Sequence, residues 1–199
     1  MPEKYLIMFF MSKIYLKGKI LKSDAKAIAV VGSREISPRG EKLTKKFVKA
    51  LVKAGFTIIS GLARGVDTIA HQTALDVGGR TIAVLGSGLD IIYPPENIDL
   101  AEKIAKNGAL VSPFAYGTKP LPKNFLARNR IIAELSQAVL VIEGARRSGT
   151  LSTASWAANQ GLDVFAIPGS EATDWLIEQG ALIAQTPKDI LITYGFNNS

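Results

Sequence analysis

The chain has 199 residues, 47% of them hydrophobic, which is enough to bury the core of a globular domain. It has no cysteine, which excludes a disulfide framework and a thiolate metal site, and its single histidine leaves almost no material for a zinc centre, so we expect neither a metal nor a cofactor. The apolar run at residues 5–11 is far shorter than the roughly 20 residues that span a bilayer, and nothing resembles a signal peptide. We therefore expect a cytoplasmic protein with no membrane partner.

Positive charge is concentrated in the first quarter of the chain. Residues 1–53 contain 13 Lys and Arg against 4 Asp and Glu, a balance of +9, whereas the remainder contains 11 against 13, a balance of −2. This asymmetry indicates a polyanionic partner. Five lysines share one face of a predicted helix, opposite an apolar stripe: Lys42, Lys45, Lys46, Lys49 and Lys53. An ordinary solvated helix also presents such a face, so both interpretations stay open.

The predicted elements fall into two parts. Residues 1–26 alternate weakly, which predicts a lead-in strand or hairpin, and residues 27–199 form the main domain. In the main domain we expect buried strands at 27–31, 56–59, 81–85, 109–111, 138–142 and 164–167, and helices at about 38–54, 67–77, 97–106, 124–136 and 150–160. A last unit, about 173–194, is expected to add a helix and a short strand at the sheet edge. The alternation predicts an α/β fold with a largely parallel sheet and helices on both faces.

Small polar residues follow the predicted strands, where an open parallel sheet collects its ligands. The segments are Gly32-Ser33-Arg34, residues 60–65, residues 86–90 and residues 143–150. Glycine allows close approach of the backbone, and hydroxyls and free amides at a helix start bind phosphate oxygens. Their arginines, Arg34, Arg64, Arg146 and Arg147, would make the pocket positive. Turn geometry alone also explains each loop taken singly.

Catalytic signatures are missing. No loop has a Walker A lysine, and Gly32-Ser33-Arg34 lacks the later glycines of a dinucleotide fingerprint. The only histidine, His71, lies inside a predicted helix and is interpreted as a structural residue, and Asp67 is interpreted as that helix's N-cap. We therefore expect a protein that is not an enzyme.

The segment at residues 123–130 combines cations with an aromatic ring. Lys123, Arg128 and Arg130 flank Phe125 next to a proline-rich loop. Bases stack on aromatic rings and phosphates pair with cations, so this composition suits a nucleic acid single strand. The alternative is structural: Phe125 would staple the helix and the arginines would cap neighbouring strands.

From about residue 28 to residue 169 the chain resembles the DNA-processing protein A family, also called Smf. The resemblance rests on ordered motifs: Val31-Gly32-Ser33-Arg34, residues 60–67 with Ala70-His71, residues 79–90, Tyr93-Pro94, Phe125 with residues 128–133, Ser148-Gly149-Thr150-Leu151 and residues 164–169. It implies an extended Rossmann-like fold that binds and protects single-stranded DNA as a homodimer. It also implies help in loading a RecA-type recombinase during recombination or natural transformation in competent cells.

Carried over by position, the resemblance gives the DNA-binding residues Gly32, Ser33, Arg34, Arg64, Lys123, Phe125, Arg128, Arg130, Ser148, Gly149 and Thr150. The chain departs from the family at residues 112–117, which lack the usual glutamate pattern, and at the short loop 169–173. Too few residues precede Ile28 for a small helical domain and none follow Ser199 for a winged helix, so we expect the core domain alone.

A second hypothesis is a small-nucleotide enzyme or sensor. Lonely Guy phosphoribohydrolases use similar glycine loops, but Ser152 stands where their catalytic glutamate would sit. The sequence leaves open the natural ligand, the dimer surface and whether recombinase loading is retained.

Overall fold

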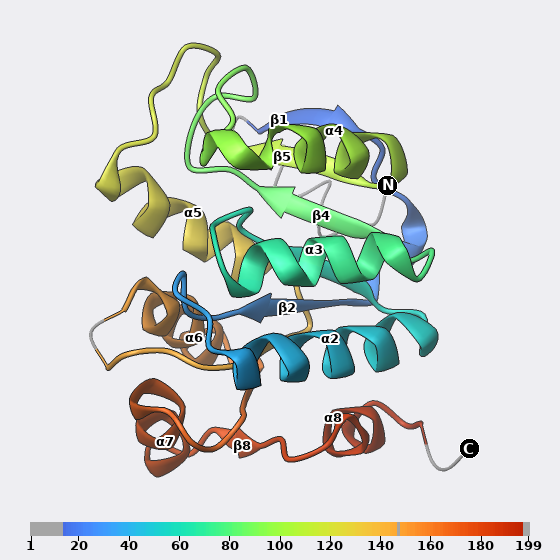
Figure 1. The fold of residues 1–199 in the computed structure, drawn as a ribbon, viewed down its shortest axis with the longest axis vertical. Helices are drawn as coiled ribbons and strands as arrows, with labels where there is room; N and C mark the ends of the chain where they lie inside the picture. Colours follow the sequence, from blue (N-terminus) through green and yellow to red (C-terminus); the bar gives the residue numbers. More distant parts are fainter. Residues whose placement is uncertain (1–13, 147, 197–199) are drawn as a thin grey trace.

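The computed structural model describes residues 14–146 and 148–196, which form one eight-stranded sheet covered by helices (Figure 1). The strands are β1 Tyr15–Gly18, β2 Ala27–Val31, β3 Thr57–Ser60, β4 Thr81–Val84, β5 Ala109–Ser112, β6 Ala138–Val141, β7 Asp163–Ala166 and β8 Leu182–Ile183. The helices are α2 Pro38–Lys53, α3 Val66–Asp76, α4 Ile98–Asn107, α5 Pro122–Glu134, α6 Gly149–Asn159, α7 Glu171–Glu178 and α8 Pro187–Thr193, with 3-10 turns η1 Lys22–Ala25 and η2 Pro95–Asn97. Each expected strand and helix is present, with ends shifted by one or two residues.

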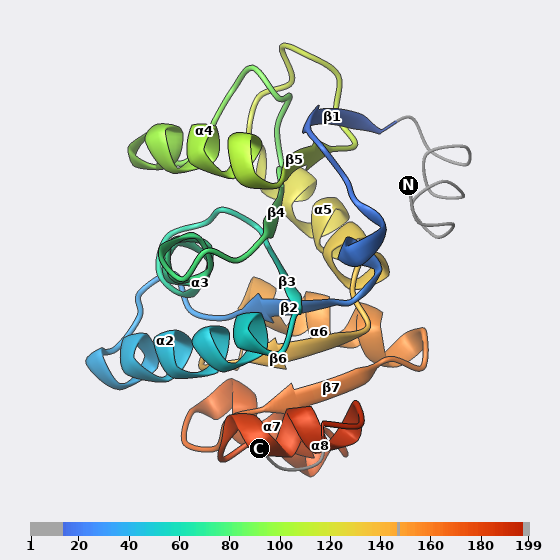
Figure 2. The ribbon, with the colours of Figure 1, turned by 90° about the vertical axis from the view of Figure 1, so that its right-hand side faces the viewer.

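Alternating side chains of the central strands face two apolar layers, which is why these strands read as unbroken hydrophobic runs. Ala27, Ala29 and Val31 of β2 pack in the layer under α5, α6 and α7, whereas Ile28 and Val30 pack under α2, α3 and α8. Figure 2 shows α2, α3 and α4 on one side of the sheet and α5 and α6 on the other. The predicted α/β class, with helices on both faces, is confirmed.

The strand order places a crevice at the centre of the sheet. The order is β1-β5-β4-β3-β2-β6-β7-β8, with β1 antiparallel to β5 and the other neighbours parallel. After β2 the chain adds β3, β4 and β5 on one side and then crosses to β6 on the other. The loops that follow β2 and β6 therefore leave in opposite directions, and the gap between them is where such folds bind ligands.

Hydrogen bonds of its N-cap hold the start of α2 beside this crevice. Ser37 is its N-cap, as predicted, and its hydroxyl accepts from the amide of Gly40 at 2.9 Å. The amide and hydroxyl of Ser37 donate to the two carboxylate oxygens of Glu143, which follows β6, each at 2.6 Å. A Cβ on Gly40 would lie 2.4 Å from that carboxyl group, so position 40 requires glycine.

Both ends of the described chain join the same sheet. β1 pairs with β5, and the following turn is held because Arg80 donates to the buried carboxylate of Asp24 at 2.8 Å. Residues 1–13 of the expected lead-in lie outside the described residues, and its separation from the main domain at residue 26 stays a prediction.

The last unit contains two helices, α7 and α8, around the edge strand β8, where one helix was expected. Within the described chain, no helix has the length and apolar character needed to cross a membrane.

His71 lies on the inner side of α3, fully buried. Its Nδ1 is 2.6 Å from the Thr81 hydroxyl, which itself donates to the carbonyl of Ile58, so Nδ1 carries the proton and donates to Thr81. Burial, aided by the charge of Arg128, lowers the pKa of His71 to about 3. The structural interpretation of this histidine agrees with its geometry.

His71 makes stability depend on pH. Because its folded pKa lies below the unfolded value of about 6.5, its contribution is complete above pH 6.5 and is lost as the pH falls toward 3. Lowering the pH from about 7.5 to about 5.5 should reduce the unfolding free energy by about 1.4 kcal/mol. His71→Asn, which retains a donor toward Thr81, should lack this loss. Urea titrations of both proteins at the two pH values test this, and an equal pH dependence would contradict it.

Candidate anion-binding site

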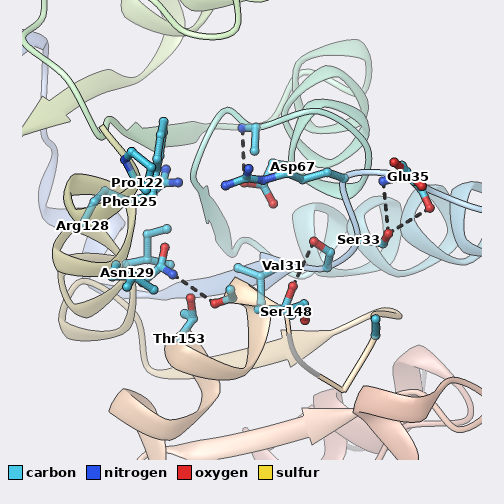
Figure 3. Close-up of a pocket in the computed structure, with 18 of the residues that line it drawn as sticks. Val31, Ser33, Glu35, Asp67, Pro122, Phe125, Arg128, Asn129, Ser148 and Thr153 are labelled. Atoms are coloured by element: carbon cyan, nitrogen blue, oxygen red, sulfur yellow. Dashed lines mark hydrogen bonds between the residues drawn. The ribbon is translucent and has the colours of Figure 1, made fainter. Parts of the chain in front are cut away.

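A cavity of about 640 Å³ lies outside the carboxyl ends of β2 and β6, at the point where the strand order reverses. Its walls come from the loops after β2, β3, β4 and β6, from one face of α5 and from the start of α6 (Figure 3). Eight of the eleven predicted DNA-binding residues line it: Gly32, Ser33, Arg34, Phe125, Arg128, Ser148, Gly149 and Thr150. The cavity therefore gathers residues that are up to 118 positions apart in sequence, from Gly32 to Thr150, and their DNA contacts remain predictions.

Hydrogen bonds of Ser33 hold the turn after β2, and Arg34 keeps free donors. The Ser33 amide donates to the carbonyl of Glu143 at 2.9 Å, and its hydroxyl donates to the carbonyl of Glu35 and accepts from the Glu35 amide. A Cβ on Gly32 would lie 2.6 Å from the side chain of Val66, so this glycine permits close packing of α3. Within the described residues the Arg34 amide has no hydrogen-bond partner, and its side chain is exposed.

The first turn of α6 lines the same cavity as Arg34 and offers further donors. Ser148 is the N-cap, but its hydroxyl makes no cap hydrogen bond and is buried without a partner among the described residues. The amide of Gly149 likewise has no partner in the part of the chain that the structure describes. Thr150 instead donates to the carbonyl of Gly32 at 3.1 Å, which ties the helix to the turn after β2. A helix start with free donors and a positive dipole end is suited to bind an anion.

Phe125 supplies an aromatic wall. Its ring packs on Gly86, where a Cβ would lie 2.6 Å from the ring, and lies 5.7 Å from the ring of Tyr93. The guanidinium groups of Arg34 and Arg128 lie 5.4 and 5.7 Å from its centroid. Phe125 is half-buried, so a planar group that enters the cavity can reach its ring. Such a group would compete with the exposed guanidinium of Arg34 for the face of the ring.

Arg128 is buried, with 3% of its surface exposed, and serves the fold as well as the cavity. Its Nη1 donates to the carbonyls of Gly61 and Val84, at the ends of β3 and β4. A Cβ on Gly61 would overlap the guanidinium, so this glycine accommodates Arg128. Burial lowers the pKa of Arg128 to about 10, which leaves it charged at neutral pH, and the charge of Asp67 opposes that decrease.

The prediction that Asp67 is the N-cap of α3 is wrong, because the helix begins at Val66 with Gly65 as its N-cap. A left-handed φ of 72° at Gly65 places the carboxylate of Asp67 inside the preceding loop. There it accepts from the amides of Gly61 and Ala63 at 3.1 and 3.3 Å. Burial raises the pKa of Asp67, and the charge of Arg128 acts in the opposite direction.

Three predicted DNA-binding residues do not line the cavity. Arg64 is exposed and forms an ion pair with Glu96. Arg130, on α5, is exposed and forms an ion pair with Glu134 at 2.6 Å. Lys123 is exposed on the first turn of α5, beside the lining residue Pro122.

The source of positive charge also differs from the prediction. Among the lining residues, Arg34 and Arg128 carry positive charge and Glu35 and Asp67 carry negative charge. Arg146 is not a lining residue, and Arg147 lies outside the described residues. The side chains of the cavity therefore carry balanced charge, and an anion could be held there only by the placement of donors.

Residues 86–90 after β4 were expected to reach the ligand, but they pack on the segment after β5 instead, whereas Tyr93, farther along the same loop, does line the cavity. Gly88 donates to the carbonyl of Thr118, and Asp90 accepts from the amide of Gly117. Ser112 donates to the carbonyl of Ser87 at 2.6 Å. The altered residues 112–117 therefore support the rim, whose lining residues are the prolines at 120 and 122.

Asn129 is a lining residue that we did not select from the sequence. Its side-chain amide donates to the carbonyl of Gly149 and to the hydroxyl of Ser152, at 3.1 and 2.8 Å, and so joins α5 to the start of α6. It lies between two residues that we did select, and no pattern marked it as buried. Nowhere in the described residues do acidic or histidine side chains cluster in a way that could hold a metal ion.

Comparisons with known proteins identify the family and the fold of the chain. The family model described as DNA recombination-mediator protein A matches residues 10–195. The chain is 46% identical to Protein Smf of Escherichia coli strain K12 over 185 residues, which are 89% of this chain and 50% of that protein. It therefore spans half the length of that relative.

Two solved structures share the whole architecture. DNA processing protein A of Streptococcus pneumoniae is 41% identical, with a TM-score of 0.85 over 92% of this chain and 67% of that chain. DNA processing protein A of Helicobacter pylori, whose structure is described as revealing its single-stranded DNA binding mode, is 30% identical, with a TM-score of 0.86 over 98% of this chain and 92% of that chain.

Removing the charge of Arg128 should destabilise the fold. Arg128→Gln leaves Asp67 without its opposite charge and two carbonyls without their donor, which is expected to cost about 3–5 kcal/mol. Arg130→Gln is the matched control, because its exposed ion pair should contribute less than about 1 kcal/mol. Urea unfolding of the three proteins measures the difference. Equal stability of the two variants would show that Arg128 is not a structural charge.

Proposed function

Because the chain belongs to the DNA recombination-mediator protein A family, we propose that the cavity outside β2 and β6 binds single-stranded DNA in recombination or natural transformation. The relative from Helicobacter pylori is described by its single-stranded DNA binding mode, and its structure covers nearly all of this chain. The observation that carries the proposal is the meeting, in one cavity, of free helix-start donors, an exposed arginine and an accessible aromatic ring.

Each part of the cavity has a role in the proposed complex. A phosphate is held by the amide and guanidinium of Arg34 on one side and by Ser148 and the Gly149 amide on the other, because these donors are free for it. The adjoining base stacks on Phe125 after the guanidinium of Arg34 turns from the ring to the phosphate. Such contacts ignore base identity, so binding should depend little on sequence and strongly on salt.

We propose that the protein binds single strands without catalysis. It acts in the cytoplasm as a homodimer that protects single strands and assists a recombinase. In support, the buried carboxylate in the cavity, Asp67, already accepts from two amides. His71 donates to Thr81 and has a pKa of about 3, which does not suit a base near neutral pH. Ser152, at the position of the phosphoribohydrolase glutamate, accepts from Asn129.

A small-nucleotide enzyme or sensor is the second candidate. Its supporting observation is the cavity volume of about 640 Å³, which is typical of a site for one small molecule. Competition distinguishes the two, since a mononucleotide that displaces a labelled oligonucleotide at low concentration would favour the small ligand.

Arg34→Ala should weaken binding of a single strand by about 1.5–3 kcal/mol, roughly tenfold to 150-fold, because one charge-assisted phosphate contact is lost. Fluorescence anisotropy with a labelled oligonucleotide, its duplex and free nucleotides measures this. Arg64→Ala is the matched control, since it removes the same charge from an exposed position outside the cavity. Equal losses in both variants would place the strand elsewhere.

Phe125→Leu should weaken binding by about 1–3 kcal/mol, the value of one base stacked on an aromatic ring. Phe125→Tyr retains the ring and should bind nearly as the wild type does. Both variants are read in the same assay, with thermal unfolding to verify that packing on Gly86 is retained. If leucine binds as well as tyrosine, the ring does not stack on a base.

A further inference from the structure

The solvent face of α2 carries a row of lysines that the cavity does not use. Its members, called here the lysine row, are Lys42, Lys45, Lys46, Lys49 and Lys53. All five are exposed, whereas Phe47 and Leu51 on the opposite face are buried. The row extends over most of the 16 residues of the helix.

This row is almost unpaired. Lys45 forms an ion pair with Glu41, and no other member has an ion pair or a side-chain hydrogen bond with the described residues. Members four positions apart, such as Lys42 and Lys46 or Lys49 and Lys53, repel each other on an α-helix. Lysines in the last turn favour the helix dipole, but those in the first half do not. The repulsion between these lysines is therefore only partly offset inside the protein, by the Glu41–Lys45 pair and by the position of Lys53 in the last turn.

The row connects the cavity with the opposite edge of the sheet. α2 begins directly after the turn at residues 32–35 that lines the cavity. In Figure 1 the helix runs alongside β2, from the cavity's edge of the sheet toward the opposite edge. It ends beside a second cavity of about 630 Å³, whose lining residues include Lys49 and Lys53. At about 1.5 Å per residue the helix is about 24 Å long, which matches about seven nucleotides of stacked strand at about 3.4 Å each.

We propose that a single strand leaving the cavity continues along α2, with its phosphates on the lysine row. The proposal rests on the proposed function of the cavity and extends it from one or two nucleotides to a track. The row accepts a flexible polyanion because its cations are exposed, unpaired apart from Lys45, and repeated about once per helical turn. A rigid partner of mixed charge would not need an unbroken row of one sign.

The test compares a short and a long oligothymidylate, about 3 and about 20 nucleotides, in a binding assay at several salt concentrations. The track variant replaces Lys42, Lys46, Lys49 and Lys53 with Gln. A matched control replaces four exposed lysines on or beside β1 and on α4 with Gln: Lys17, Lys19, Lys103 and Lys106. Both variants lose the same net charge, and Figure 1 shows α4 and β1 far from α2.

The track variant should bind the short oligonucleotide as the wild type does and the long one at least about tenfold more weakly. Its salt slope for the long strand should fall by roughly 0.7 per lysine, about 3 in total. The control variant should keep the slope of the wild type. Equal slopes in the track variant and the wild type, or equal losses in track and control variants, would overturn the track while leaving the cavity intact. If the wild type binds neither oligonucleotide, the proposed function fails together with the track.

Discussion

Arg128 brings a positive charge into a place with almost no access to water, and the carboxyl edge of the sheet is arranged around it. Its guanidinium joins the ends of β3 and β4 through two carbonyls, and the carboxylate of Asp67 lies close enough to affect its pKa. Gly61 leaves room for it, and the ring of Phe125 lies over it. Because a buried charge is tolerated only when it is paired and hydrogen-bonded, α5 is fixed against the sheet, and with it the aromatic wall of the cavity.

The reversal of strand order between β2 and β6 sets the position of the cavity that this aromatic wall borders. Two turns that are more than a hundred residues apart in sequence become neighbours, and the hydrogen bonds from Ser33 to Glu143 and from Thr150 to Gly32 hold them together. The Ser33 amide donates to Glu143 and its hydroxyl donates to Glu35, so Ser33 has no free donor. The donors of Arg34, Ser148 and Gly149 have no hydrogen-bond partner among the described residues. The fold therefore builds the proposed anion site from ordinary loop connections, with no phosphate-binding sequence motif.

Sequence patterns predicted the strands because each is a short buried run of branched side chains, and they predicted the cavity's edge because parallel strands end there together. They did not predict the roles of Gly61 and Gly86, which make room for Arg128 and Phe125 rather than for a ligand. Nor did they place Arg64 or Arg130, because an arginine's neighbours, here Glu96 and Glu134, decide whether it faces a cavity or an exposed acid. Asn129 was missed since its partners lie on another helix.

The central claim is that a single strand lies in the cavity between the turns after β2 and β6. A crystal structure of the protein with a short oligothymidylate tests this claim most directly. The account predicts a phosphate between the Arg34 guanidinium and the first turn of α6, with a thymine on the ring of Phe125. A strand bound at any other surface, with the cavity free of nucleotide, would contradict it.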